Sequence, residues 1–200
     1  MGYDVYEVAS PQGWKKDPKL VLDFYNMRRR DVAAALPNAA HKGLAALEKD
    51  FSVTIITQNI DDLHERAGSI NVIHLHGEIF KMRGERDEHK IYDIRSDINA
   101  GDMAEDGSQL RPHIVWFDEH VPKIFDAKEI IKTADIFVLV GTSLQVYPAS
   151  GLINYVKPDV PKIIIDKKIP LVSGLQNIHL IEKPATEGVK ELQMILQNQY

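Results

Sequence analysis

Polar side chains follow two apolar runs at the points where those runs end. Residues 53–57 form an apolar run typical of a buried strand, and it stops at Gln58 and Asn59. A second short run, residues 71–75, leads into His76. Because ligands bind beyond the carboxyl ends of strands in open α/β sheets, we expect these side chains to line one ligand site. An imidazole there is suited to proton transfer, since its unperturbed pKa lies near neutral pH.

Each of these residues also has a structural explanation. Residues 60–67 predict a short helix that ends at Gly68, and Asn59 and Asp61 are residue types that commonly cap a helix start. His76 could be a core histidine that is satisfied by hydrogen bonds. For any one residue the structural explanation is favoured, so the functional interpretation depends on the whole string.

These residues belong to a series of motifs that resembles the sirtuins, the NAD-dependent protein deacylases. The motifs, in chain order, are QNID at residues 58–61, LHERAGS at residues 63–69, LHG at residues 75–77, PHIVWF at residues 112–117 and GTS at residues 141–143, followed by Val146, Pro148 and Ala149. The resemblance extends along nearly all of the 200 residues. Several motifs in family order are a far more specific signal than a single glycine pattern.

The resemblance implies an α/β fold in which a Rossmann-like parallel sheet carries helices on both faces. Residues 1–80 and 111–200 would form the NAD-binding domain, and residues 81–110 a small insertion module. Sirtuins open with a strand and a glycine-rich GAGIS turn that binds the phosphates of NAD, and nothing in this chain matches that segment. We therefore expect the first βα unit to be missing, and residues 1–16 to be irregular.

The resemblance also implies that NAD is the co-substrate and that His76 is the general base. In the family's reaction the acyl-lysine carbonyl oxygen attacks the nicotinamide ribose and nicotinamide leaves. A ribose hydroxyl, activated by the histidine, then attacks the acyl carbon to give O-acyl-ADP-ribose and free lysine. The positions expected to bind NAD are Gln58, Asn59, Ile60, Asp61, Gly141, Thr142, Ser143, Asp166 and Ala185. Asp166 replaces the family's usual asparagine, and an acid there can still accept from ribose hydroxyls.

Two residues of a predicted helix over residues 17–36 indicate a preference for acidic acyl groups. Tyr25 and Arg28 are three positions apart, and the pair resembles that of the class III sirtuins, which remove succinyl and malonyl groups. A guanidinium suits this task because it binds a carboxylate in a bidentate way. Ala9 resembles the small residue that leaves room for the longer acyl chain. The alternative is that Tyr25 edges the core and that Arg28 belongs to a solvated basic run.

The segment of residues 110–117 reads as an apolar strand that would lie against the substrate peptide. In the family this segment pairs with the peptide as an added strand, and Val115 and Phe117 match the positions that flank the lysine side chain. Asp118 departs from the glycine that the family usually has there. The substitution places a side chain and a negative charge where the peptide approaches.

The insertion module lacks the zinc ligands that most sirtuins carry. The chain has no cysteine, and residues 82–85 stand where the first CxxC would fall. His89 and His113 match no usual zinc spacing, so we expect no metal. The module would be held by its few apolar residues, which are Ile91, Tyr92, Ile94 and Ile98.

Composition excludes several functional classes. A net charge of −5 argues against a general nucleic-acid binder, which would normally be basic. No apolar run is long enough to cross a membrane, and the first residues lack the apolar core of a signal peptide. We therefore expect a cytoplasmic enzyme whose partners are proteins or peptides that carry acylated lysine.

Three functional hypotheses follow. The first is an NAD-dependent lysine deacylase acting on succinyl, malonyl and, as a third candidate, acetyl groups. The second is a catalytically impaired remnant that binds NAD weakly because the phosphate-binding turn is missing. The third is ADP-ribosyl transfer to protein at the same site. His76, the QNID motif and the pair Tyr25 and Arg28 favour the first hypothesis, and the missing turn favours the second.

Overall fold

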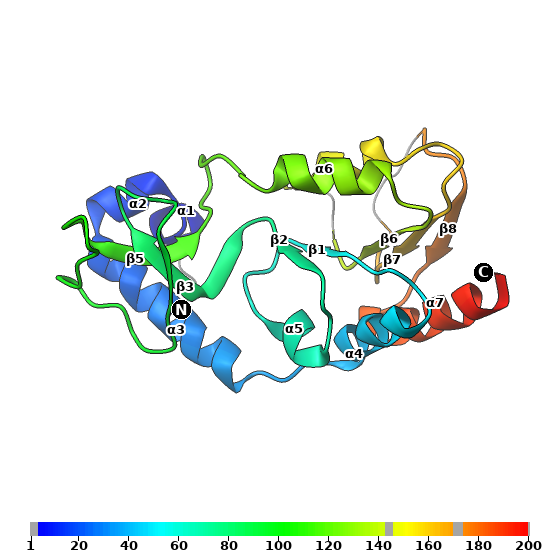
Figure 1. Ribbon diagram of the computed structural model, residues 1–200, viewed down its shortest axis with the longest axis horizontal. Helices are drawn as coiled ribbons and strands as arrows, with labels where there is room; N and C mark the ends of the chain where they lie inside the picture. The colour runs from blue at the N-terminus through cyan, green and yellow to red at the C-terminus, as the bar shows by residue number, and fades with distance from the viewer. Residues whose placement is uncertain (1–3, 143–145, 170–173, 200) are drawn as a thin grey trace. The chain divides into compact units, whose positions relative to one another are not determined.

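The computed structural model describes residues 4–142, 146–169 and 174–199 (Figure 1). The chain forms two compact units. Unit 1 comprises Met1–Leu36, Thr57–Asp62 and His74–Val121, and unit 2 comprises Pro37–Ile56, Leu63–Ile73 and Pro122–Tyr200.

Unit 1 combines helices with an antiparallel sheet of strand order β4-β3-β5. Its elements are α1 (Val5–Val8), α2 (Pro11–Lys16), α3 (Pro18–Ala34), β3 (Gly77–Gly84), β4 (Ile91–Asp93) and β5 (Leu110–Ile114). The helix predicted over residues 17–36 is confirmed as α3. Asp17 caps it by accepting from the Leu20 N–H at 2.9 Å, and Pro18 occupies the first turn, where no N–H is needed.

The prediction that residues 1–16 are irregular is wrong, because they form α1 and α2. The Asp4 side chain caps α1 on the Tyr6 N–H, and the Ser10 side chain caps α2 on the Gly13 N–H at 3.0 Å. Pro11 stands at the first position of α2, where proline begins a helix instead of breaking one.

The core of unit 1 is aromatic and lies between α3 and the sheet. Its buried members are Trp14, Val21, Leu22, Tyr25, Ile79, Phe80, Ile98, Ile114 and Trp116. Two buried polar residues of α3 reach from this core to the insertion module. Asn26 donates to the Ile98 carbonyl at 2.9 Å and accepts from the Ile98 N–H at 3.0 Å. Arg29 donates to the Ile79 carbonyl at 2.9 Å and to the Ser96 carbonyl at 3.2 Å.

The sequence led us to expect that apolar residues alone hold the module. The structure shows that hydrogen bonds hold it as well. Ile98 is buried and Ile94 packs against the core, but Ile91 is exposed. The hydrogen bonds of Asn26 to Ile98 and of Arg29 to Ser96 supply attachment that the apolar residues do not. Since both α3 residues are buried, their bonds form in a low-dielectric setting where a broken one is costly.

Unit 2 is built on a parallel sheet of strand order β6-β7-β8. Its elements are α4 (Ala39–Ala46), the 3₁₀ helix η1 (Leu47–Lys49), α5 (Leu63–Ala67), α6 (Ile124–Lys132), β6 (Phe137–Val140), the 3₁₀ helix η2 (Ala149–Tyr155), β7 (Lys162–Ile165), β8 (Ile178–Ile181) and α7 (Ala185–Gln199). Every residue of β7 is buried, so both faces of the central strand are covered. Ile163 and Ile165 pack with Val189 and Leu192 of α7, and Figure 1 shows α6 on the other side of this sheet.

A further pair of strands, β1 (Ile55–Thr57) and β2 (Val72–His74), forms a two-stranded sheet. These strands confirm the two predicted apolar runs, with shorter bounds. The predicted helix over residues 60–67 begins later, as α5 at Leu63, and Gly68 follows it with a positive φ of 107°. Within the described residues, the β1–β2 pair is not hydrogen-bonded to the β6-β7-β8 sheet.

Candidate active site

The ends of β1 and β2 bring the predicted QNID motif, residues 58–61, beside His76. The Leu75 N–H donates to the Thr57 carbonyl at 2.9 Å, so the two strands end at the same level. The chain then continues from Thr57 into Gln58 and from Leu75 into His76. This is the arrangement that the strand-end argument predicted from sequence.

The imidazole of His76 is held by the backbone of the QNID motif. Its Nδ1 lies 3.1 Å from the Gln58 carbonyl oxygen. A carbonyl oxygen can only accept, so the neutral ring carries its proton on Nδ1 and leaves the lone pair on Nε2. Burial lowers the pKa of His76 from its ordinary value, and the bond to Gln58 opposes that shift. The ring is therefore neutral at neutral pH, with Nε2 able to take a proton.

The QNID motif is itself fixed by hydrogen bonds. The Asn59 N–H donates to Thr57 Oγ1 at 3.0 Å, and the Ile60 carbonyl accepts from the Ile79 N–H at 2.8 Å. His74 Nδ1 lies 3.1 Å from the Asn59 carbonyl oxygen, which repeats the contact that His76 makes. Because the backbone groups are engaged, the side chains of this motif project from a constrained loop.

Gly77 lets β3 start against the backbone of β5. Its φ is +82°, and a Cβ built there would lie 2.1 Å from the His113 carbonyl oxygen. Any other residue would meet both the strained dihedral and the clash. The close approach allows the Val115 N–H to donate to the His76 carbonyl at 2.9 Å.

The predicted substrate segment, residues 115–117, is thus bonded directly to the candidate base. At its other end the Phe117 N–H donates to the Ala9 carbonyl at 3.0 Å. Val115 is half-buried and Phe117 is exposed, so this stretch presents one side to solvent. The strand β5 ends at Ile114, so the predicted strand over residues 110–117 is shorter than expected.

Asp118, which stands where the family usually has glycine, follows this segment directly. It is exposed, and its φ is +66°. That left-handed backbone suits glycine, which explains why the related pattern has glycine there. The sequence analysis did not identify the ion pair between Arg111 and Glu119. Its signal is a pair of opposite charges on the two sides of the Trp116-Phe117 turn.

Tyr25 and Arg28 share α3, but Tyr25 is buried and Arg28 is exposed. Tyr25 is only 3% exposed, and its ring stacks on Trp116 with centroids 6.4 Å apart. Burial raises the pKa of Tyr25, which keeps its hydroxyl protonated. The Arg28 side chain is 54% exposed, lies 4.0 Å from Asp31 and sits over the Phe24 ring at 5.3 Å.

Unit 2 gathers the other predicted NAD positions at one edge of its sheet. Gly141 follows β6 and Asp166 follows β7, and these strands are neighbours in register, with Val140 opposite Ile165. Ala185 begins α7 just beyond the end of β8. Gly141 has a φ of +60°, and no atom of the described residues lies within 4 Å of where its Cβ would be.

The Asp166 carboxylate accepts from the Lys168 N–H at 3.0 Å. Thr142 lies next to Gly141, and Ser143 falls outside the described residues.

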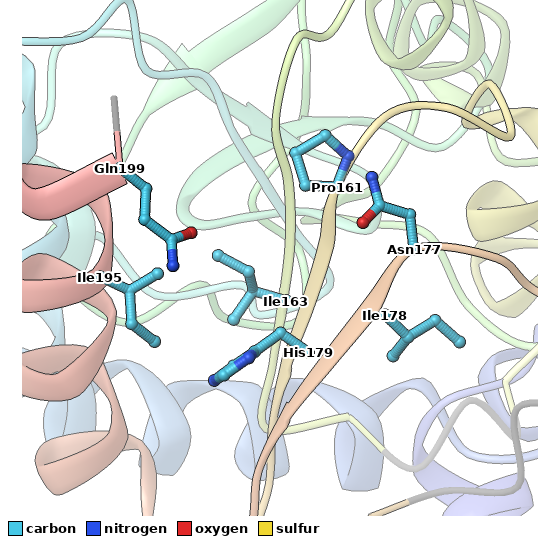
Figure 2. A pocket seen from close by; sticks show the side chains of 7 residues that line it. All are labelled: Pro161, Ile163, Asn177, Ile178, His179, Ile195 and Gln199. Atoms are coloured by element: carbon cyan, nitrogen blue, oxygen red, sulfur yellow. The ribbon is translucent and has the colours of Figure 1, made fainter.

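A pocket of about 180 Å³ occurs elsewhere in unit 2 (Figure 2). Its lining residues are Pro161, Ile163, Asn177, Ile178, His179, Ile195 and Gln199. Pro161 and Asn177 immediately precede β7 and β8, so the pocket opens at the amino ends of these strands. It is therefore separate from the edge where Gly141 and Asp166 lie.

The part of the chain that the structure describes contains no group of three or more histidine or acidic side chains placed to hold a metal ion. His89 is exposed and its N–H donates to Asp87, while His113 is half-buried on β5. None of the described helices has the length and apolar character needed to span a membrane.

Comparison with known proteins assigns the chain to a family. The model of the Sir2 family matches residues 2–148. The chain is 50% identical over 191 residues to the NAD-dependent protein deacylase of Helicobacter pylori, covering 96% of this chain and 83% of that protein. It is 48% identical over 200 residues to the NAD-dependent protein deacylase of Bacteroides thetaiotaomicron, covering 97% of this chain and 86% of that protein.

Solved structures agree with this assignment. A Sir2 homologue in complex with NAD superposes with a TM-score of 0.87 at 35% identity, over 98% of this chain and 78% of that one. Sir2 bound to an acetylated peptide superposes with a TM-score of 0.80 at 26% identity, over 96% of this chain and 84% of that one. The fold is the predicted α/β fold with a parallel sheet and a small antiparallel insertion sheet. The chain belongs to the Sir2 family, the sirtuins.

Proposed function

We propose that this chain is an NAD-dependent deacylase that removes succinyl and malonyl groups from protein lysines and releases nicotinamide and O-acyl-ADP-ribose. Deacylase chemistry is supported by the names of the relatives from Helicobacter pylori and Bacteroides thetaiotaomicron. The observation that carries the proposal is the fixed imidazole of His76, whose Nδ1 is engaged by the Gln58 carbonyl and whose Nε2 can act as a base.

The residues divide the task between binding and proton transfer. When bound, NAD supplies the glycosidic bond to nicotinamide whose cleavage makes acyl transfer favourable. Gly141 allows close approach of a ribose, and the Asp166 carboxylate accepts from its hydroxyls. Asn59 and Asp61 orient the nicotinamide and its ribose. His76 Nε2 takes the proton from a ribose hydroxyl, and the Gln58 carbonyl stabilises the charged ring that results.

We assign the acidic acyl preference to Arg28, with the protonated hydroxyl of Tyr25 on the same helix as a second donor. The contact of Arg28 with Asp31 is long, at 4.0 Å, and both side chains are more than half exposed. Exposed pairs of this kind contribute about 0–1 kcal/mol, so an acyl carboxylate could replace Asp31 at little cost. A succinyl or malonyl carboxylate would then gain bidentate hydrogen bonds to the guanidinium.

Mass spectrometry of a succinyl-lysine peptide, incubated with the purified chain with and without NAD, tests the function. We expect NAD-dependent loss of the succinyl group together with O-succinyl-ADP-ribose. His76→Ala should lower kcat by about 10²–10⁴-fold, the usual contribution of a general base. A folded chain that gives no product would support the impaired-remnant hypothesis, and ADP-ribose on the peptide would support the transferase hypothesis.

The acyl preference has its own test. Arg28→Gln should lower kcat/KM for the succinyl peptide by about tenfold or more, which corresponds to loss of a charge-assisted hydrogen bond. The same variant should leave the rate on an acetyl peptide nearly unchanged, because acetyl carries no carboxylate. An unchanged ratio of the two rates would remove Arg28 from substrate recognition while leaving the deacylase function standing.

A further inference from the structure

A buried ion pair lies beneath the turn that follows the substrate segment. Arg111 Nη1 donates to Glu119 Oε1 at 2.8 Å and Nη2 donates to Glu119 Oε2 at 3.2 Å, so the contact is bidentate. The Arg111 side chain is 5% exposed and that of Glu119 is 21% exposed. A pair this deep is costly to desolvate and is retained only where its hydrogen bonds are well made.

Both partners also bond the backbone of the turn, and Arg111 contacts the indole of Trp116. Glu119 Oε2 accepts from the Trp116 N–H at 2.8 Å, and Arg111 Nη2 donates to the Ile114 carbonyl at 2.9 Å. The Arg111 guanidinium lies over the Trp116 ring, 3.2 Å from its centroid. The two charged residues therefore fix the main chain on both sides of Val115 and hold the indole of the residue that follows it.

Trp116 also packs against two other aromatic rings. It is buried, and its ring lies 5.6 Å from that of Trp14 and 6.4 Å from that of Tyr25. Its neighbours Val115 and Phe117 are the residues predicted to flank the acyl-lysine. Because Trp116 cannot shift without disturbing the Arg111–Glu119 pair, the placement of Val115 and Phe117 depends on that pair.

The charge state of the pair suits this role. Burial alone would raise the pKa of the Glu119 carboxyl, but hydrogen bonding and the charge of Arg111 together with the Trp116 N–H hold its pKa below the ordinary value. The carboxylate is therefore ionised at neutral pH, where it can accept from three N–H groups at once.

We propose that Arg111 and Glu119 are positioning residues for the acylated peptide. They act through Trp116 to fix the position of residues 115–117, the segment predicted to contact the peptide, and the Val115 N–H links that segment to the His76 backbone. The proposal rests on the proposed deacylase function for its kinetic consequences. The proposed ordering of residues 115–117 does not depend on whether the chain is catalytically active.

The test uses Arg111→Lys and Glu119→Gln in the full chain. Lysine keeps the charge but cannot bind Glu119 in a bidentate way, bond the Ile114 carbonyl and stack on Trp116 together. Glutamine keeps the shape and one acceptor but loses the charge. We expect the KM for the acyl peptide to rise about tenfold while the KM for NAD stays within about twofold, which is the pattern for loss of peptide binding alone.

Glu7→Gln is the matched control, because Glu7 forms an exposed ion pair with Lys16 at 3.2 Å in the same unit. It should change neither KM. An unchanged KM for the acyl peptide, or equal increases in both KM values, would overturn the positioning role. A general loss of folding would instead lower the apparent kcat and leave both KM values unchanged.

Amide hydrogen exchange separates this proposal from the proposed function. If the wild-type chain proves inactive, the exchange rates of the Trp116 and Phe117 amides still report on the segment. We expect both to rise about tenfold or more in Arg111→Lys, while amides in unit 2 stay unchanged. Unchanged exchange at Trp116 and Phe117 overturns the inference whether or not the enzyme turns over.

Discussion

Replacing Asn26 by alanine should detach the insertion module from α3. The side chain makes three buried hydrogen bonds, two with the backbone of Ile98 and one with Arg29 Nη1 at 2.8 Å. Alanine leaves the Ile98 N–H and C=O buried without these partners, and each such group costs about 1–3 kcal/mol. We expect the free energy of unfolding to fall by about 3 kcal/mol, a large share of the total for an ordinary domain.

Urea unfolding followed by circular dichroism gives the global effect, and hydrogen exchange of residues 94–99 gives the local one. Local exchange matters because two compact units need not unfold in a single step. Asn71→Ala is the control, since exposed Asn71 donates to Thr54 Oγ1 and its loss should cost less than about 0.5 kcal/mol.

A second variant, Asn26→Asp, tests which of these hydrogen bonds matter. Asn26→Asp keeps an acceptor for the Ile98 N–H and adds charge facing Arg29, but it replaces the donor to the Ile98 carbonyl with an oxygen that repels it. Because two of the three hydrogen bonds remain, it should still cost less than Asn26→Ala. A loss below about 1 kcal/mol for Asn26→Ala, with unchanged exchange in the module, would refute the view that these hydrogen bonds anchor it.

Three further predictions follow from backbone conformation and titration. Gly77→Ala should lower the free energy of unfolding by about 2–4 kcal/mol in urea, because its Cβ would meet the His113 carbonyl at a positive φ, and wild-type stability would contradict this. Asp118→Gly should raise Tm by about 1–2 °C, because relief of the left-handed backbone exceeds the added chain entropy, and a lower Tm would contradict it. The lowered pKa of His76 means that folding favours the neutral ring, so its stabilisation is complete above pH of about 6.5 and is lost as the pH falls through the folded-state pKa. The acid limb of the kcat/KM profile should accordingly have its midpoint below about pH 6.5, and a midpoint above that value would exclude His76 as the titrating base.

Elements with local signals could be predicted from the sequence. Asp17 and Pro18 are a local signal for the start of α3, and Asn38 is one for the start of α4. The apolar run of β7 is typical of a buried strand. The expectation of irregular structure over residues 1–16 was wrong because Ser10 followed by Pro11 starts a helix, a cap with proline in the first turn.

The part of the candidate site that lies at strand ends could be predicted from the sequence. The exposure of the side chains on α3 could not. The rule that ligands meet strand ends placed the QNID motif beside His76. Spacing alone suggested that Tyr25 and Arg28 point the same way, but the buried stripe of α3 runs through Leu22, Tyr25 and Arg29. Arg28 lies just outside that stripe, so its guanidinium reaches solvent.

The anchoring of the module by α3 also has a consequence for the order of events during protein synthesis. Asn26 and its partner Ile98 are 72 positions apart in the chain. At a synthesis rate of about 5–20 residues per second, Asn26 waits roughly 4–14 s before Ile98 is made. Asp17 and Pro18 let α3 form from local contacts during that interval. The helix can therefore act as a preformed template on which the later module closes.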